Sequence, residues 1–172
     1  MRVILFRHGP AAERDALRWP DDSLRPLTSR GAQLTREAVT GLARIEPHID
    51  QVATSPFARA RQTAQVVADV LRIGEIAELD ALRPGGSVDE IILFLAARMP
   101  RRTIVLVGHE PDLGTLAGLL LFGAPMPLPL RKAGACAIRF EDSPREGGGR
   151  LAWFLPPRVL RKDTKRRLHP AH

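Results

Sequence analysis

The sequence is poor in cysteine and in aromatic residues: its 172 residues include one cysteine, no tyrosine and only 5% aromatic side chains. The single cysteine, Cys136, excludes an internal disulfide and a metal site built from several cysteines. Cys136 lies in the alternating run 135–140, so we expect a half-buried strand residue there and not a nucleophile. The scarcity of aromatic side chains, with no motif for stacking bases, argues against a module that only binds nucleic acid.

Long hydrophobic runs are also missing. No apolar run approaches the roughly 20 residues that a membrane-spanning helix needs. Only four apolar residues stand between Arg2 and Arg7, too few for the apolar core of a signal peptide. We therefore expect a cytoplasmic protein that makes no use of a membrane.

Positive charge is concentrated at the C-terminal end of the chain. The net charge is +7, and residues 158–172 hold six Lys or Arg against one Asp, which gives this end +5. We expect one domain over residues 1–157, followed by a basic and partly disordered tail over residues 158–172. Such a tail either is a solvated end or attracts an acidic partner such as a phosphorylated protein, polyphosphate or RNA.

Strand and helix patterns alternate along the chain. Residues 2–6 and 103–107 are short runs of mostly apolar residues, as in strands buried on both faces. Weaker strands are expected at 49–54, 74–79, 134–141 and 150–155, the last two as a hairpin at a sheet edge. This alternation predicts a three-layer α/β/α sandwich whose sheet is mostly parallel with an antiparallel edge.

Local signals mark where the helices begin and end. Thr28 is expected to cap a helix that stops before Pro47. Ser55 is expected to cap a second helix, with Pro56 in its first turn and Gly74 as its stop. Two further helices are expected at residues 88–99, after a capping box, and at residues 111–122.

Both strongly apolar strands end in a histidine, His8 after Arg7 and His109 after Gly108. If the two strands are parallel neighbours, both imidazoles lie in the crevice at their carboxyl ends. Arg59, in the first turn of a helix that follows another strand, can reach the same rim. Two arginines, two imidazoles and helix N-termini around one cavity suit a tetrahedral dianion such as a phosphoryl group.

Three motifs in this order resemble a known family. Arg7-His8-Gly9, Ser55-Pro56-x-x-Arg59-Ala60-x-Gln62-Thr63-Ala64 and Gly108-His109-Glu110-Pro111 are similar to the signatures of the histidine phosphatase superfamily, which has the phosphoglycerate mutase-like fold. Arg25-Pro26-Leu27-Thr28, Gly31 and the late Trp153 with Pro156-Pro157 resemble its short SixA-type phosphohistidine phosphatases. The similarity covers roughly residues 1–160.

The resemblance implies a role for each matched residue. His8 would be the nucleophile that forms a phosphohistidine intermediate, and Arg7 and Arg59 would clamp the phosphoryl oxygens. His109, in its protonated form, would stabilise charge on the transferring group. No metal or other cofactor is expected, because the arginines supply the positive charge. Since neutral His8 is the form that attacks, we expect its other ring nitrogen to donate to a fixed acceptor such as a backbone carbonyl.

No pattern singles out a general acid. The candidate carboxyl groups belong to Glu13, Asp15, Asp22, Asp80 and Glu110. We select Asp80, which precedes the loop 82–86. A missing acid would matter less for phosphohistidine, because its imidazole leaving group has a pKa of roughly 6.5 and departs more readily than an alkoxide.

The sequence therefore favours a metal-independent phosphatase that acts through phospho-His8 on protein phosphohistidine. The lack of a long insertion predicts an open, shallow site that admits either a phosphorylated protein or a small phosphoester. One alternative is a broad-specificity phosphomonoesterase for small molecules, and another is a non-catalytic binder of phosphorylated protein or nucleic acid. Taken alone, His8 could be a buried histidine bonded to the backbone, and Arg59 a solvated helix residue like Arg61.

Overall fold

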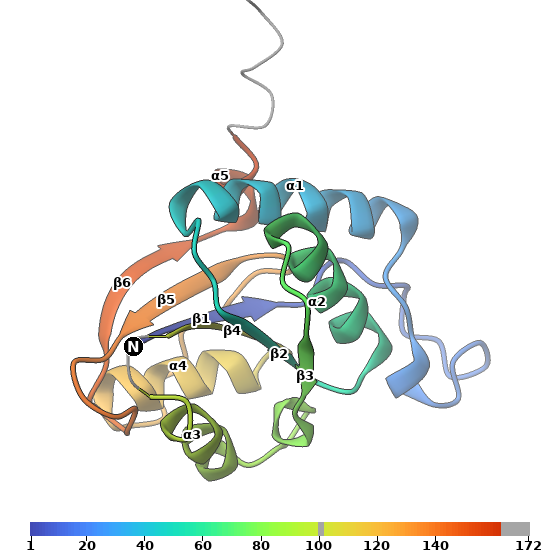
Figure 1. The fold of residues 1–172 in the computed structure, drawn as a ribbon. Coiled ribbons are helices and arrows are strands. Elements are labelled where there is room, and N and C mark those ends of the chain that lie inside the picture. Colours follow the sequence, from blue (N-terminus) through green and yellow to red (C-terminus); the bar gives the residue numbers. More distant parts are fainter. Residues whose placement is uncertain (100–101, 163–172) are drawn as a thin grey trace, which may run out of the picture.

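The computed structural model describes residues 1–99 and 102–162, and these residues form one mixed sheet with helices on both faces (Figure 1). The strand order is β3-β2-β4-β1-β5-β6; the first four strands are parallel, and β5 and β6 extend the sheet as an antiparallel hairpin. The strand bounds are β1 Arg2–Arg7, β2 Gln51–Thr54, β3 Ile76–Glu78, β4 Thr103–Gly108, β5 Ala135–Arg139 and β6 Arg150–Leu155. The predicted edge hairpin is thereby confirmed.

The helices form the outer two layers. Figure 1 shows α1 (Ser29–Ile45), α2 (Ala58–Leu71) and α5 (Pro157–Leu160) on one face of the sheet, and α3 (Val88–Ala96) and α4 (Asp112–Phe122) on the other. Successive side chains of a strand point to opposite faces, so Val3 and Leu5 of β1 pack in the core under α3 and α4, whereas Ile4 and Phe6 pack under α1 and α2. The predicted three-layer sandwich is confirmed.

The two strands that lead to histidines are hydrogen-bonded neighbours at the centre of the sheet. β1 pairs with β4 in parallel, and Arg7 lies opposite Gly108 in the register. The backbone N–H of His8 continues this ladder by donating to the carbonyl of Gly108 at 3.1 Å. His8 and His109 therefore leave the sheet side by side, as expected from the two strand ends.

The structure confirms two predicted helix starts and corrects a third. Ser87 accepts the Glu90 N–H and caps α3, as the capping box predicted. The Thr28 side chain accepts a hydrogen bond from the Gly31 N–H and caps α1, as predicted. Ser55 does not cap α2, which begins at Ala58 after Phe57 with no side-chain cap. The reason is tertiary: the Ser55 hydroxyl oxygen lies 2.8 Å from His109 Nε2.

The predicted stop of α2 at Gly74 is also wrong. The helix ends at Leu71, and Arg72 takes the left-handed conformation with φ 58° that a terminal glycine would otherwise adopt. α4, by contrast, does end at a glycine, because Gly123 follows Phe122 in the left-handed conformation. Two short 3₁₀ helices, η1 (Asp22–Leu24) and η2 (Asp80–Leu82), lie between the longer elements.

Two remaining expectations concern Cys136 and the C-terminal end. Cys136 lies on β5, as expected, but it is fully buried, and burial raises the pKa of its thiol to about 12. Leu160 is buried where α5 packs on α1, so the start of the predicted tail is folded, whereas residues 163–172 lie outside the described residues. Within the described part of the chain, no helix has the length and apolar character needed to cross a membrane.

Candidate functional site

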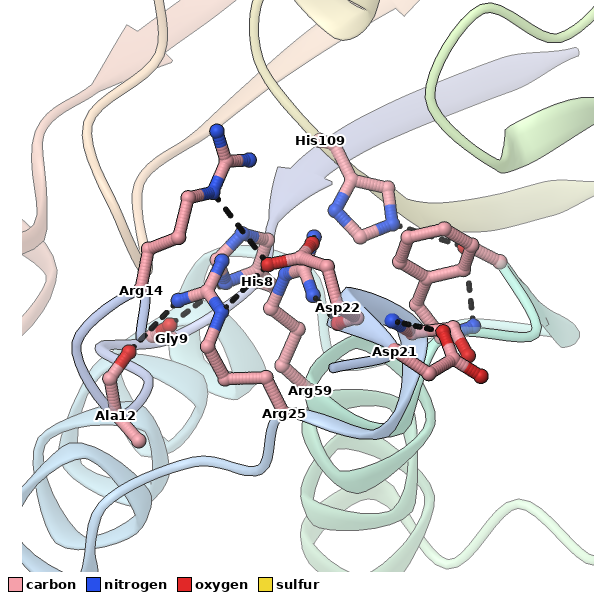
Figure 2. Close-up of polar contacts among 12 residues, drawn as sticks. His8, Gly9, Ala12, Arg14, Asp21, Asp22, Arg25, Arg59 and His109 are labelled. Atoms are coloured by element: carbon pink, nitrogen blue, oxygen red, sulfur yellow. Dashed lines mark hydrogen bonds and ion pairs between the residues drawn. The ribbon is translucent and has the colours of Figure 1, made fainter. Parts of the chain in front are cut away.

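The structure brings four predicted residues together at the carboxyl end of β1 and β4. Arg7 ends β1, His8 and His109 directly follow β1 and β4, and Arg59 projects from the first turn of α2. Figure 2 shows His8, Arg59 and His109 around one site. The ring centroids of His8 and His109 are 5.1 Å apart. His8, Arg59 and His109 are only 5%, 3% and 3% exposed, so their side chains are less open to solvent than the shallow site we expected from the sequence.

His8 is held as a neutral imidazole with one free ring nitrogen. Its Nδ1 lies 2.7 Å from the Gly9 carbonyl oxygen, which can only accept, so Nδ1 carries the proton and Nε2 keeps its lone pair. The expected bond to a backbone carbonyl is thus confirmed. Burial lowers the pKa of His8 to about 3, and the charges of Arg59 and Arg7 act in the same direction.

The turn after His8 is fixed by α1 and α2. The Gly9 N–H donates to Thr63 Oγ1 at 3.0 Å, and the Thr63 hydroxyl donates to the Arg59 carbonyl one turn earlier in α2. A Cβ at Gly9 would lie 2.0 Å from Thr35 Oγ1 of α1, so the close approach of the turn to both helices requires glycine.

Each of the two arginines is anchored through its terminal nitrogens. Arg7 donates through one terminal nitrogen to the Leu130 carbonyl at 2.8 Å. Arg59 donates to the Asp22 carbonyl at 2.8 Å and to Asp22 Oδ2 at 3.0 Å. Burial lowers the pKa of both guanidinium groups, while Glu110 acts to raise the pKa of Arg7 and Asp22 that of Arg59.

His109 is fixed from one side. Its Nε2 lies 2.8 Å from Ser55 Oγ, and its ring meets the Phe57 ring edge-on at 5.2 Å between centroids. Burial, His8 and Arg59, in this order, lower the pKa of His109 to about 3. Without a bound anion this pKa favours the neutral ring. A dianion bound beside His109 would raise the pKa, toward the protonated form that the family resemblance implies.

Three buried nitrogen atoms of this cluster have no hydrogen-bond partner. They are Arg7 Nε, Arg59 Nε and His109 Nδ1, and among the described residues Trp19 Nε1 is the one other buried side-chain nitrogen or oxygen in this condition. An unsatisfied buried polar group costs about 1–3 kcal/mol, so such groups point to a missing partner. Partner-free nitrogens on three of the four residues fit an oxyanion bound beside His8.

Three further residues border the site: Asp22 was considered from the sequence only as a candidate acid, Arg25 only as part of a family motif, and Lys132 not at all. The Asp22 carboxylate joins Arg59 to Arg25, whose Nε donates to Asp22 Oδ1 at 2.9 Å (Figure 2). Burial acts to raise the pKa of Asp22, but the hydrogen bond from Arg25 and the charge of Arg59 outweigh it and hold the pKa below its ordinary value. Lys132, before β5, adds a positive charge that lowers the pKa of His8.

The selected acid, Asp80, makes its ion pair outside the cluster. Asp80 begins η2, is 66% exposed at its side chain and forms an ion pair with Arg83 at 3.1 Å. In residues 1–99 and 102–162, no hydrogen bond or ion pair joins Asp80 to Arg7, His8, Arg59 or His109. Of the other carboxyl candidates, Asp22 contacts Arg59, and Glu110 accepts the N–H of Leu130, whose carbonyl binds Arg7.

Comparisons with known proteins agree with this geometry. Residues 3–84 match the histidine phosphatase superfamily (branch 1). Over 160 residues the chain is 32% identical to phosphohistidine phosphatase SixA of Escherichia coli K12, covering 91% of this chain and 94% of that protein. An uncharacterized protein of Picosynechococcus sp. is 36% identical over 143 residues, covering 81% of this chain and 85% of that protein. The solved structure of protein histidine phosphatase SixA complexed with tungstate superposes with a TM-score of 0.80 at 30% identity, covering 91% of this chain and 97% of that one.

Proposed function

This chain belongs to the histidine phosphatase superfamily and is a phosphatase, and we propose that it hydrolyses phosphohistidine on proteins through a covalent intermediate on His8. The observation that carries the proposal is the group of partner-free nitrogens on Arg7, Arg59 and His109 beside a neutral His8. The relative SixA is named for this substrate class, and its structure holds tungstate, which is a tetrahedral oxyanion like phosphate. Both facts support the proposal.

In the first step, the lone pair on His8 Nε2 attacks the phosphorus atom. A P–N bond to His8 forms while the P–N bond of the substrate breaks, and the substrate ring, protonated on its second nitrogen, leaves as neutral imidazole. Arg7, Arg59 and His109 hold the three equatorial oxygens. Phosphoryl transfer depends mostly on such positioning and charge stabilisation, which this chain's own cations supply.

In the second step, water attacks the phosphorus of phospho-His8. The bond between phosphorus and Nε2 breaks, its electron pair returns to the ring, and phosphate leaves with the protons of the water. The bond from His8 Nδ1 to the Gly9 carbonyl keeps the ring in one tautomer and orientation through both steps.

The carboxyl groups near the cluster support a substrate whose leaving group needs little protonation. Asp22 is ion-paired with Arg59 and Arg25, which keeps it ionised and makes it a poor acid. Burial raises the pKa of Glu110. Its carboxylate, however, accepts hydrogen bonds from the N–H groups of Leu130 and Gly114, which act to lower that pKa and fix its oxygens on the backbone. A general-acid role for Asp80 stays a proposal for ester substrates only. Phosphohistidine is therefore the substrate that this set of residues suits best.

A substrate panel tests the proposal. Wild-type protein, His8→Ala and His48→Ala are compared on a phosphohistidine peptide, an aryl phosphate and sugar phosphates; His48 is an exposed histidine and serves as the control. We expect wild type and His48→Ala to prefer the phosphohistidine peptide, and His8→Ala to be inactive on every substrate. Full activity in His8→Ala would overturn the mechanism. A marked preference for the esters would instead identify a broad-specificity phosphomonoesterase.

A further inference from the structure

The hydroxyl group of Ser55 is buried at the edge of the phosphoryl site and contacts His109 directly. Ser55 Oγ lies 2.8 Å from His109 Nε2, and it accepts the backbone N–H of Phe57 at 3.3 Å. We propose that Ser55 is a positioning residue whose hydroxyl donates to His109 Nε2 and thereby holds the neutral ring as the Nδ1–H tautomer, which then donates to a phosphoryl oxygen. This inference rests on the proposed function of the same site.

The direction of the Ser55–His109 hydrogen bond follows from counting donors and acceptors. A serine hydroxyl has one hydrogen and two lone pairs, and the Phe57 N–H already occupies one lone pair. In the described part of the chain, His109 Nε2 is the one hydrogen-bonded neighbour of Ser55 Oγ that can accept its hydrogen. If Nε2 carried a proton instead, the hydroxyl hydrogen would be buried without an acceptor, at a cost of about 1–3 kcal/mol.

The tautomer decides what His109 offers to a bound anion. Nδ1 is buried without a partner, and Figure 2 shows it on the side of the ring that faces His8. With a proton, Nδ1 adds a third donor to the partner-free Nε atoms of Arg7 and Arg59. Without one, its lone pair would repel the phosphoryl oxygens. A single hydrogen bond from Ser55 therefore determines whether His109 Nδ1 attracts or repels a phosphoryl oxygen.

The charges that face His109 favour the neutral ring. His8, Arg59 and Arg25 disfavour a second proton on the ring, Asp22 favours one, and burial removes the solvation that an imidazolium ion needs. Arg7 and Arg59 already supply two positive charges to the same oxygens. In the resting site, a neutral N–H donor on His109 thus joins the two arginines without adding a third buried cation.

Nuclear magnetic resonance on ¹⁵N-histidine-labelled protein tests the tautomer directly. At pH 7, the His109 ring of the wild type should be neutral with its proton on Nδ1, and Ser55→Ala should convert it partly or wholly to the Nε2–H form. The His109 signals are identified as those that disappear in His109→Ala. A proton on Nε2 in the wild type, or an unchanged tautomer in Ser55→Ala, would overturn the inference.

Kinetics with a matched control separate positioning from structural support. Ser55→Ala should lower kcat about tenfold, as expected for one hydrogen bond. Thr54→Val, which removes a neighbouring buried hydroxyl that donates to the Ser55 carbonyl, should keep wild-type activity. In a His109→Ala background, Ser55→Ala should not lower kcat any further. Additive losses of kcat from the two substitutions would contradict the inference.

The two proposals fail in distinguishable ways. The tautomer is measured on the resting protein, so it reports on Ser55 even if phosphohistidine is not the substrate. If Ser55→Ala does not fold, the wild-type tautomer still decides the matter. Loss of turnover in His8→Ala tests the proposed function alone.

Discussion

Single residues of the site connect protonation to stability. Burial lowers the pKa of His8 and of His109 to about 3, whereas a histidine in an unfolded chain has a pKa near 6.5. Between these values the unfolded chain binds more protons, so the stability present above pH 6.5 is lost as the pH falls toward 3. The same burial that prepares His8 to attack therefore makes the fold sensitive to acid.

We predict that the free energy of unfolding falls steeply between pH 7 and pH 5. Each histidine should contribute about 2 kcal/mol to this fall by linkage. In the double variant His8→Asn/His109→Asn the fall should be smaller by the sum of the two contributions. Urea unfolding at both pH values measures the difference, and an equal fall in both proteins would contradict the low pKa values.

Arg59 and Arg61 form a matched pair two positions apart on α2. Arg59 is buried and has one nitrogen free for the substrate, whereas Arg61 is exposed and pairs with Glu78 at 3.5 Å. Arg59→Ala should lower kcat/KM roughly 10²-fold, as expected for a lost hydrogen bond to a charged group, and Arg61→Ala should change it little. Arg59→Lys should restore little activity, because lysine has no equivalent of Nε. Similar losses in both alanine variants would contradict the assignment.

Metal removal gives a further prediction from these side chains. Because Arg7 and Arg59 carry the positive charge that faces the phosphoryl oxygens, hydrolysis should continue at the same rate in excess EDTA. Rates before and after chelation, with and without added Mg²⁺, measure this. A rate that falls on chelation and recovers with Mg²⁺ would show that the arginines do not suffice.

At the scale of elements, the segment before β5 connects the ends of both central strands. The Leu130 N–H donates to Glu110 Oε1 at 3.0 Å, and the Leu130 carbonyl accepts from Arg7. Ala133, in the left-handed conformation, donates its N–H to the carbonyls of Arg7 and His8. Glu110 and Arg7 are thus joined through the backbone of one residue, Leu130, in addition to the effect of the Glu110 charge on the pKa of Arg7.

This relay predicts different effects for two variants of Glu110. Glu110→Gln keeps an oxygen that can accept the Leu130 N–H, so its affinity for inorganic phosphate should stay close to that of the wild type. Glu110→Ala loses this acceptor, and its inhibition constant for phosphate should rise about tenfold. Competition against an aryl phosphate measures both constants. Equal effects of the two substitutions would mean that charge, and not the hydrogen bond, is what Glu110 contributes.

The elements also show which parts of the site follow from sequence patterns. The strands that carry His8 and His109 are continuous apolar runs, and the carboxyl ends of parallel neighbours must meet at one edge, so their juxtaposition is predictable. Ser55 was misassigned because a cap rule considers only adjacent residues, whereas its oxygen lies beside His109, 54 positions away. Asp22 begins the short helix η1 and Lys132 lies in a turn, and their contacts depend on how distant segments meet.

At the scale of the whole molecule, α5 closes the face that α1 and α2 cover. α1 approaches α5 closely at Gly41, where an added Cβ would lie 1.8 Å from the Leu160 carbonyl oxygen. Glycine to alanine within a helix ordinarily gains about 1 kcal/mol. A loss of stability in Gly41→Ala would therefore indicate that the added methyl group disturbs the contact with α5.

We predict that Gly41→Ala lowers the midpoint of thermal unfolding. Gly74→Ala is the control, because no atom lies within 4 Å of the added Cβ there, and it should leave the midpoint unchanged or slightly higher. Differential scanning calorimetry on both variants decides the matter. An undiminished midpoint in Gly41→Ala would mean that α5 does not pack on α1 as described.

The central position of β1 protects its backbone amides from hydrogen exchange. β1 is hydrogen-bonded to β4 on one side and to β5 on the other, and Val3, Ile4, Leu5 and Phe6 have no exposed surface. Its amides can exchange with deuterium only when the whole molecule unfolds. The segment from Ala11 to Leu27 lies outside the sheet; among the described residues its one β-bridge pairs its two ends, and Asp22 within it binds Arg59. Its amides should therefore exchange sooner than those of β1, so His8 follows the strand whose backbone is the last to open, whereas the partner of Arg59 lies on a segment that opens earlier.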